Sequence, residues 1–124
     1  MQSTGDTDGG FWVVPSDATG IVRVRGWGFW SPAVASVFVE KVLAGCRATR
    51  RPSELVFDAD ALKPQRDEGQ TAIGAMFDEV AKLGVSRISV ITSSPLTRLQ
   101  LARIARAGIK KGVVELRSAT ETGT

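Results

Sequence analysis

Residues 54–92, ELVFDADALKPQRDEGQTAIGAMFDEVAKLGVSRISVIT, decide the fold. The apolar run 55–57 predicts a strand that is covered on both faces, and 88–91 predicts a second strand. Between them, apolar residues at three- and four-residue spacing from Ile73 to Leu83 predict an amphipathic helix. Two strands that one helix connects run parallel, with a right-handed crossover. The stretch is therefore a complete βαβ unit.

Both ends of this predicted helix carry sequence signals. Asp67 at the N-cap, with Gln70 three residues later, predicts a capping box. Gly84 suits the left-handed position that follows the last helical turn. We therefore expect a helix over 67–83.

On the N-terminal side, the polar and glycine-rich residues 1–10 predict a disordered segment, so that order begins at Phe11. Residues 11–14 and 21–25 read as two strands, and the short turn between them predicts an antiparallel hairpin. Ser31 and Pro32 then open a helix.

On the C-terminal side, a second Ser-Pro pair at 94–95 opens a helix through about Ala107, which Gly108 ends. Residues 113–116 predict a last strand, and 118–124 a frayed tail. We thus expect one domain over 11–117. Its α/β architecture is a mixed sheet of about five strands, an antiparallel hairpin followed by parallel βαβ units, with three to four helices.

Composition narrows the function. The 124 residues are 43% hydrophobic and 23% charged, with a net charge of +3, one cysteine and no histidine. Without histidine the chain lacks the commonest general base and zinc ligand. The start of the chain has no signal-peptide pattern and no apolar run reaches membrane-spanning length, so we expect a cytoplasmic protein. Cys46 is expected to be a small core residue.

Carboxylates are the remaining acid–base groups. Asp58 and Asp60 are expected just past the carboxyl end of a strand, and Asp67 and Glu68 at the start of the next helix. Ligands of open α/β sheets gather at such strand ends, and paired carboxylates there can hold Mg²⁺ for a phosphatase reaction. Helix capping and loop hydrogen bonds explain the same residues, however. We therefore predict no metal, no cofactor and no catalytic residue.

Two further clusters are open to two readings each. Trp27, Phe29 and Trp30 can close the end of the core, or form a patch for a small anionic or lipid-like ligand. Leu99 lies amid a basic helix face that includes Arg103, which can be a solvated surface or a partner-binding one. The mild basic excess does not by itself predict nucleic-acid binding, although the basic face leaves that alternative open.

The segment LVFDADALKPQRDEGQTAIGAM resembles the central segment of the STAS family, the sulfate-transporter and anti-sigma-factor-antagonist domains. In that family an apolar strand ends in Asp, and an Asp-Ser-Ser-Gly motif starts the following helix. Residues 55–58 match the strand and Gly69 matches the glycine of the motif. The resemblance implies a STAS-like fold over about 11–117 and a protein partner, as in the anti-sigma-factor antagonists of the family.

The chain departs from the family at the motif itself. Regulated members are phosphorylated on a serine there, whereas residues 66–69 read Arg-Asp-Glu-Gly and carry no hydroxyl. The acidic pair either mimics a phosphoserine or is only a good helix start. We predict a non-enzymatic, self-associating (dimeric) regulatory module that binds a protein. The predicted binding residues are Asp58, Asp60, Asp67, Glu68, Gly69, Leu99 and Arg103.

Overall fold

The computed structural model describes residues 3–119, which form one six-stranded mixed sheet and four helices. This confirms the predicted α/β class. The strands are β1 Ser3–Asp6, β2 Gly9–Ser16, β3 Ile21–Gly28, β4 Glu54–Leu62, β5 Arg87–Ile91 and β6 Val114–Arg117. The helices are α1 Pro32–Ala48, α2 Asp67–Lys82, α3 Pro95–Ile104 and α4 Arg106–Lys110.

The sheet follows the order of the chain, β1-β2-β3-β4-β5-β6. The first three strands pair antiparallel, and the β3–β4, β4–β5 and β5–β6 pairs are parallel. The predicted hairpin is β2–β3. The strand that the sequence did not predict is β1, which lies within the segment that we expected to be disordered. That expectation is wrong for residues 3–10, and residues 1 and 2 lie outside the described part.

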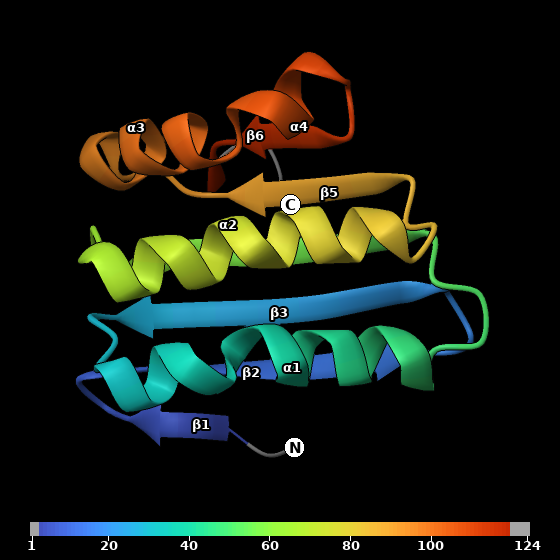
Figure 1. The fold of residues 1–124 in the computed structure, drawn as a ribbon, viewed down its shortest axis with the longest axis horizontal. Helices are drawn as coiled ribbons and strands as arrows, with labels where there is room; N and C mark the ends of the chain where they lie inside the picture. The colour runs from blue at the N-terminus through green and yellow to red at the C-terminus, as the bar shows by residue number, and fades with distance from the viewer. Residues whose placement is uncertain (1–2, 120–124) are drawn as a thin grey trace.

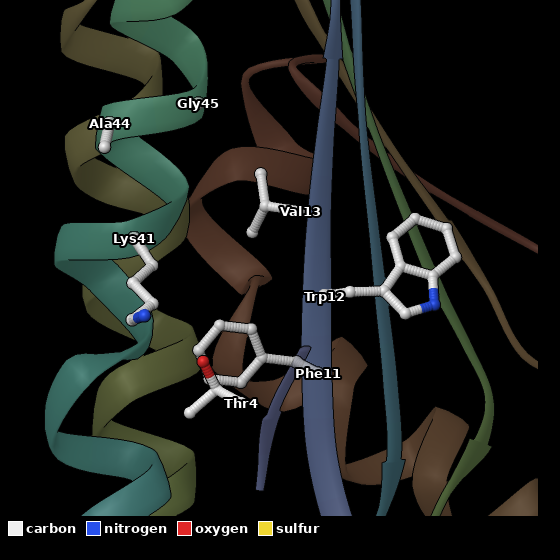
Figure 2. Close-up of a pocket in the computed structure, with 7 residues that line it drawn as sticks. All are labelled: Thr4, Phe11, Trp12, Val13, Lys41, Ala44 and Gly45. Carbon is white, nitrogen blue, oxygen red and sulfur yellow. The ribbon is translucent and has the colours of Figure 1, made fainter. Parts of the chain in front are cut away.

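All four helices lie on one face of the sheet (Figure 1). Figure 2 shows the resulting alternation along β2: Phe11 and Val13 point toward α1, whereas Trp12 points to the opposite face. The same alternation on β4 buries Leu55 and Phe57 completely and leaves Val56 half-buried. The prediction that this strand is covered on both faces is therefore wrong, and the sheet has an open face.

An aromatic cluster fills the core beneath α1. The Phe38 ring lies 4.9 Å from that of Phe11, 4.6 Å from that of Trp30 and 5.9 Å from that of Phe57, centroid to centroid. All four side chains are 3% exposed or less. Trp30 also donates its indole N–H to the Gly10 carbonyl at 2.9 Å. The cluster joins β2, β4 and the segment between β3 and α1 to α1 itself, so it fixes where α1 begins.

Asp58 and Asp60 lie inside β4 and not beyond its end, contrary to our expectation. The strand continues to Leu62, which is buried, through an irregularity in its pairing with β3. Asp58 Oδ1 accepts a hydrogen bond from the Asp60 backbone N–H at 3.1 Å. Asp60 Oδ1 accepts one from the Ser93 backbone N–H at 2.9 Å, which ties β4 to the chain after β5.

The start of α2 differs from the predicted capping box. The N-cap residue is Arg66, Asp67 is the first helical residue, and no side chain caps the helix. Gln70 Nε2 instead donates to the Gln65 carbonyl at 2.9 Å, because Gln65 is buried directly before the helix. The other end was predicted correctly: Gly84 follows the helix with a φ of 89°.

The third predicted helix breaks in two. Its regular part ends at Ile104, and α4 carries the chain on to Lys110, so Gly108 does not end a helix. A Cβ on Gly108 would lie 2.6 Å from Val114 Cγ2, so glycine here lets α4 pack against β6. Of the predicted frayed tail, Ala119 donates its N–H to Ser93 Oγ at 3.0 Å. Residues 120–124 lie outside the described part.

Cys46 is a core residue, as predicted, with 1% of its surface exposed. Burial raises the pKa of its thiol above the ordinary value of 9.0, and the charge of Arg47 opposes this shift. Folding therefore favours the protonated thiol, and the unfolded chain loses this proton first as the pH rises.

We expect this thiol to make the protein less stable at high pH. Its contribution is full below pH 9.0 and is lost as the pH rises from there through the raised pKa, by at most about 1.4 kcal/mol per pH unit. Urea unfolding of the wild type and of Cys46→Ala from pH 7 to 10 measures the difference. Parallel pH profiles for the two proteins would contradict this prediction.

Candidate functional site

Three helices begin at the same edge of the sheet, where β3, β4 and β5 end (Figure 1). The Ser31 and Ser94 side chains cap α1 and α3, each accepting a backbone N–H three residues on, at 3.3 and 3.4 Å. We call this region the helix-start edge. In parallel sheets such an edge is where ligands and partners commonly bind.

The three helix starts differ in charge. The first turn of α2 contains Asp67 and Glu68, both exposed, whereas the first turns of α1 and α3 contain no acidic residue. Carboxylates at a helix N-terminus stabilise the helix through its dipole. They also place two negative charges where a partner can reach them.

A shallow groove of about 500 Å³ separates the first halves of α1 and α2. Its sides are mostly apolar and built from small residues, with the acidic pair at one end. The lining residues are Pro32, Ala35, Ser36, Val39, Asp67, Glu68, Thr71, Ala72 and Ala75. The groove is thus suited to an apolar side chain of a partner that carries a positive charge nearby.

Gln65 holds the segment before α2 in place. Its side chain is 5% exposed. Its Oε1 accepts the Trp30 backbone N–H at 3.0 Å, and its Nε2 donates to the carbonyls of Gly28 at 3.0 Å and Lys63 at 2.6 Å. Its backbone exchanges two hydrogen bonds with the Gln100 side chain, at 2.7 and 2.9 Å. One residue therefore connects the starts of α1 and α2 with the middle of α3.

Gly69 is buried and serves this arrangement. A Cβ at Gly69 would lie 2.8 Å from both Cβ and Oε1 of Gln65, closer than real Cβ contacts. The glycine therefore lets the first turn of α2 sit against the Gln65 side chain. Because Gly69 is buried, its own atoms do not reach the surface where we predicted partner contact. Its role is to position Asp67 and Glu68.

The three aromatic residues singled out in the sequence do not share one surface. Trp30 belongs to the core, whereas Trp27 donates its indole N–H to the Asp6 carbonyl at 2.7 Å and lines a hollow with Trp12 on the open face. Phe29 is 37% exposed and lies beneath the Arg66 guanidinium, 5.1 Å from ring centroid to Cζ. Of the three rings, only that of Phe29 is thus exposed beside the helix-start edge.

The other predicted binding residues lie away from the groove. Asp58 and Asp60 belong to β4, as described above. Leu99 is 68% exposed on α3 and lines a small hollow with Arg103 and Arg106. The structure therefore places Asp67, Glu68 and Gly69 together and the remaining four elsewhere. Within residues 3–119 no group of three or more metal-ligating side chains occurs, and no helix is long and apolar enough to span a membrane.

The element order and the sheet define a STAS-like fold. The crystal structure of an anti-sigma factor antagonist from Mycobacterium paratuberculosis is similar, with a TM-score of 0.54 and 20% sequence identity. The similarity covers 91% of this chain and 89% of that one. No protein-family model and no curated protein matches. At this identity the likeness confirms the fold that the sequence resemblance implied.

Sequence reasoning missed the residues that shape the site. Gln65 and Gln100 carry no local signal, because their hydrogen bonds join positions that are 35 residues apart in the sequence. The groove residues of α1 were also missed. The small residues at Ala35, Ala72 and Ala75 on the two helices were the only available signal, since small side chains leave space between packed helices.

Proposed function

We propose that this chain is a non-enzymatic regulatory module that binds a protein partner at the helix-start edge. One observation carries the proposal: an apolar groove opens directly beside the exposed Asp67–Glu68 pair. The fold supports it, because a similar structure is that of an anti-sigma factor antagonist. The absence of histidine from the sequence supports a role without catalysis.

The groove and the charges point to the chemistry of the partner. Apolar groups gain by leaving water, and cations gain beside the two carboxylates. A partner segment with an apolar side chain next to a lysine or arginine matches both features. An acidic segment would be repelled by Asp67 and Glu68.

Charge reversal at the first turn of α2 tests the proposal. We expect Asp67→Lys to weaken binding of the protein that the wild-type chain captures from a cell extract by about tenfold or more. Titration of the captured partner gives the dissociation constants. Asp78→Lys is the matched control, because Asp78 is exposed on the same helix but lies outside the groove.

Filling the groove is a second test of the same surface. Thr71 is exposed and lines the groove, so Thr71→Trp should fill it without entering the core, and Thr71→Ser should bind normally. Melting curves establish that each variant is folded. Unchanged partner affinity for both Asp67→Lys and Thr71→Trp would show that the helix-start edge is not the binding surface.

A further inference from the structure

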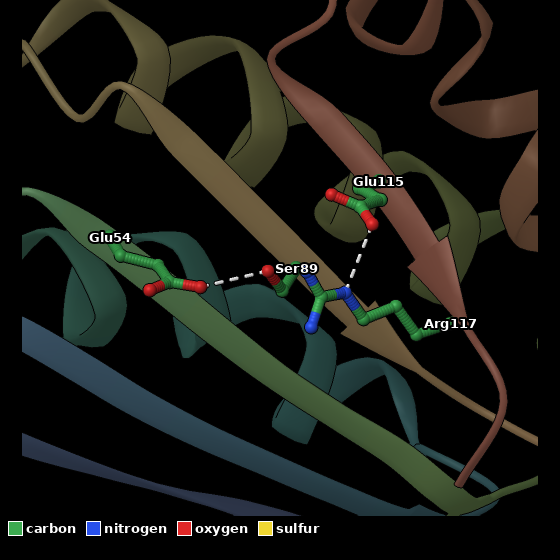
Figure 3. Close-up of polar contacts among 4 residues, drawn as sticks. All are labelled: Glu54, Ser89, Glu115 and Arg117. Carbon is green, nitrogen blue, oxygen red and sulfur yellow. Dashed lines mark hydrogen bonds and ion pairs between the residues drawn. The ribbon is translucent and has the colours of Figure 1, made fainter. Parts of the chain in front are cut away.

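The face of the sheet opposite the helices carries an ordered set of charges. Figure 3 shows this face with the helices behind it, and with Ser89 donating to Glu54 at 2.8 Å and Arg117 paired with Glu115 at 3.1 Å. Trp12 also points to this face (Figure 2). In the described part of the chain all helices pack on the other face, so we call this one the open face.

The strand register aligns four side chains of the open face in one row. Trp12 is paired with Arg25, Arg25 with Asp58, and Asp58 with Ile91. Register partners of adjacent strands lie side by side and project to the same face. Arg25 is exposed and the other three are half-buried. Across β2 to β5 the row therefore reads apolar, positive, negative, apolar.

Such a row is complementary to itself. A second copy can place its open face against the first across a two-fold axis. This axis lies between the two sheets, runs parallel to the strands and passes over the gap between β3 and β4. Arg25 of each copy then faces Asp58 of the other, and Trp12 of each faces Ile91 of the other. Sheets that pack face to face keep their strands aligned within about 30° and lie about 10 Å apart, which allows this arrangement.

The charges along the two central strands extend this match. Arg23, exposed on β3, and Glu54, half-buried on β4, repeat the positive and negative signs of Arg25 and Asp58. The open face thus places positive charge on β3 and negative charge on β4. Around a two-fold axis between these strands, Arg25 faces Asp58 of the other copy, and Arg23 faces Val56, which has Glu54 and Asp58 on either side of it on the same face of β4. A two-fold interface closes without leaving a surface for further growth.

We propose that the open face binds a second copy of this chain and forms a two-fold symmetric dimer. The sequence led us to expect a homo-oligomer, and the register of Arg25 and Asp58 supplies the surface and the symmetry. The proposal does not depend on the helix-start edge, which lies on the helices. Either surface can fail its test without affecting the other.

Single charge reversals and their mixture test the proposal. In sedimentation velocity over a concentration series, the wild type should dimerise. Arg25→Asp alone and Asp58→Arg alone should each raise the dimer dissociation constant by about tenfold or more, because like charges then meet at two symmetric positions. An equimolar mixture of the two variants should form a heterodimer, since every facing pair is again of opposite sign.

Controls separate the surface from general charge effects. Arg98→Asp reverses an exposed arginine on α3 and should leave dimerisation unchanged. The double variant Arg25→Asp/Asp58→Arg should dimerise like the wild type, and circular dichroism establishes that each variant is folded. A wild type that stays monomeric would overturn the proposal. Single variants that both dimerise as strongly as the wild type, or a mixture that forms no heterodimer, would overturn it too.

Discussion

Replacing Gln65 by leucine is expected to lower the free energy of unfolding by about 2–4 kcal/mol. The substitution keeps a side chain of similar size but removes its three hydrogen bonds to Gly28, Trp30 and Lys63. A buried donor left without a partner costs about 1–3 kcal/mol, and each lost bond about 0.5–1.5 kcal/mol. The Trp30 N–H becomes such a donor. Urea denaturation of the two proteins at neutral pH measures the difference.

Gln70→Leu is the matched control for Gln65→Leu. Gln70 makes one hydrogen bond from its side chain, to the Gln65 carbonyl, and that carbonyl also accepts from Gln100. The control should therefore cost no more than about 1 kcal/mol. Equal losses for the two variants would mean that the Gln65 side chain does not hold the segment before α2 in place.

Trp30→Ala is expected to destabilise the protein by about 3–5 kcal/mol, the usual cost of deleting a large buried ring. Trp30 is 3% exposed and lies against the rings of Phe11 and Phe38, at 5.6 and 4.6 Å between centroids. Its removal also leaves the Gly10 carbonyl without the indole donor. Thermal and urea unfolding measure the loss.

Phe29→Ala is the comparison for Trp30→Ala, because Phe29 is the exposed ring next to Trp30 in the sequence. Phe29 lies under Arg66 at the surface, where a cation–π contact contributes about 0.5–1 kcal/mol. We expect a loss of that size from this variant. If Phe29→Ala were as costly as Trp30→Ala, the division of this pair into a core ring and a surface ring would be wrong.

Much of the fold was predictable because the signals for it are local. The 3.6-residue period of α2, the Ser-Pro entrances of α1 and α3, and Gly84 each depend on neighbouring residues alone. Strand β1 was missed because the sequence of Ser3–Asp6 has no apolar alternation. Its residues are largely exposed, and it is held by pairing with β2.

The site was less predictable than the fold, because tertiary contacts define it. Asp67 and Glu68 were identified from their position at a helix start, and they lie exposed there. Asp58 was assigned to the same edge because a polar residue after an apolar run resembles the end of a strand. In the structure the strand continues past it, so its carboxylate belongs to the open face of the sheet.

The order of the strands bears on how the chain folds. Each strand pairs with the one before it in sequence, so no strand must insert between two that have already paired. The chain that links two neighbouring strands holds at most one helix or the α3–α4 pair, and the entropy lost on closure rises with the length of chain that is closed. During synthesis each new strand can therefore add to a growing edge as it leaves the ribosome, with β6 the last to join.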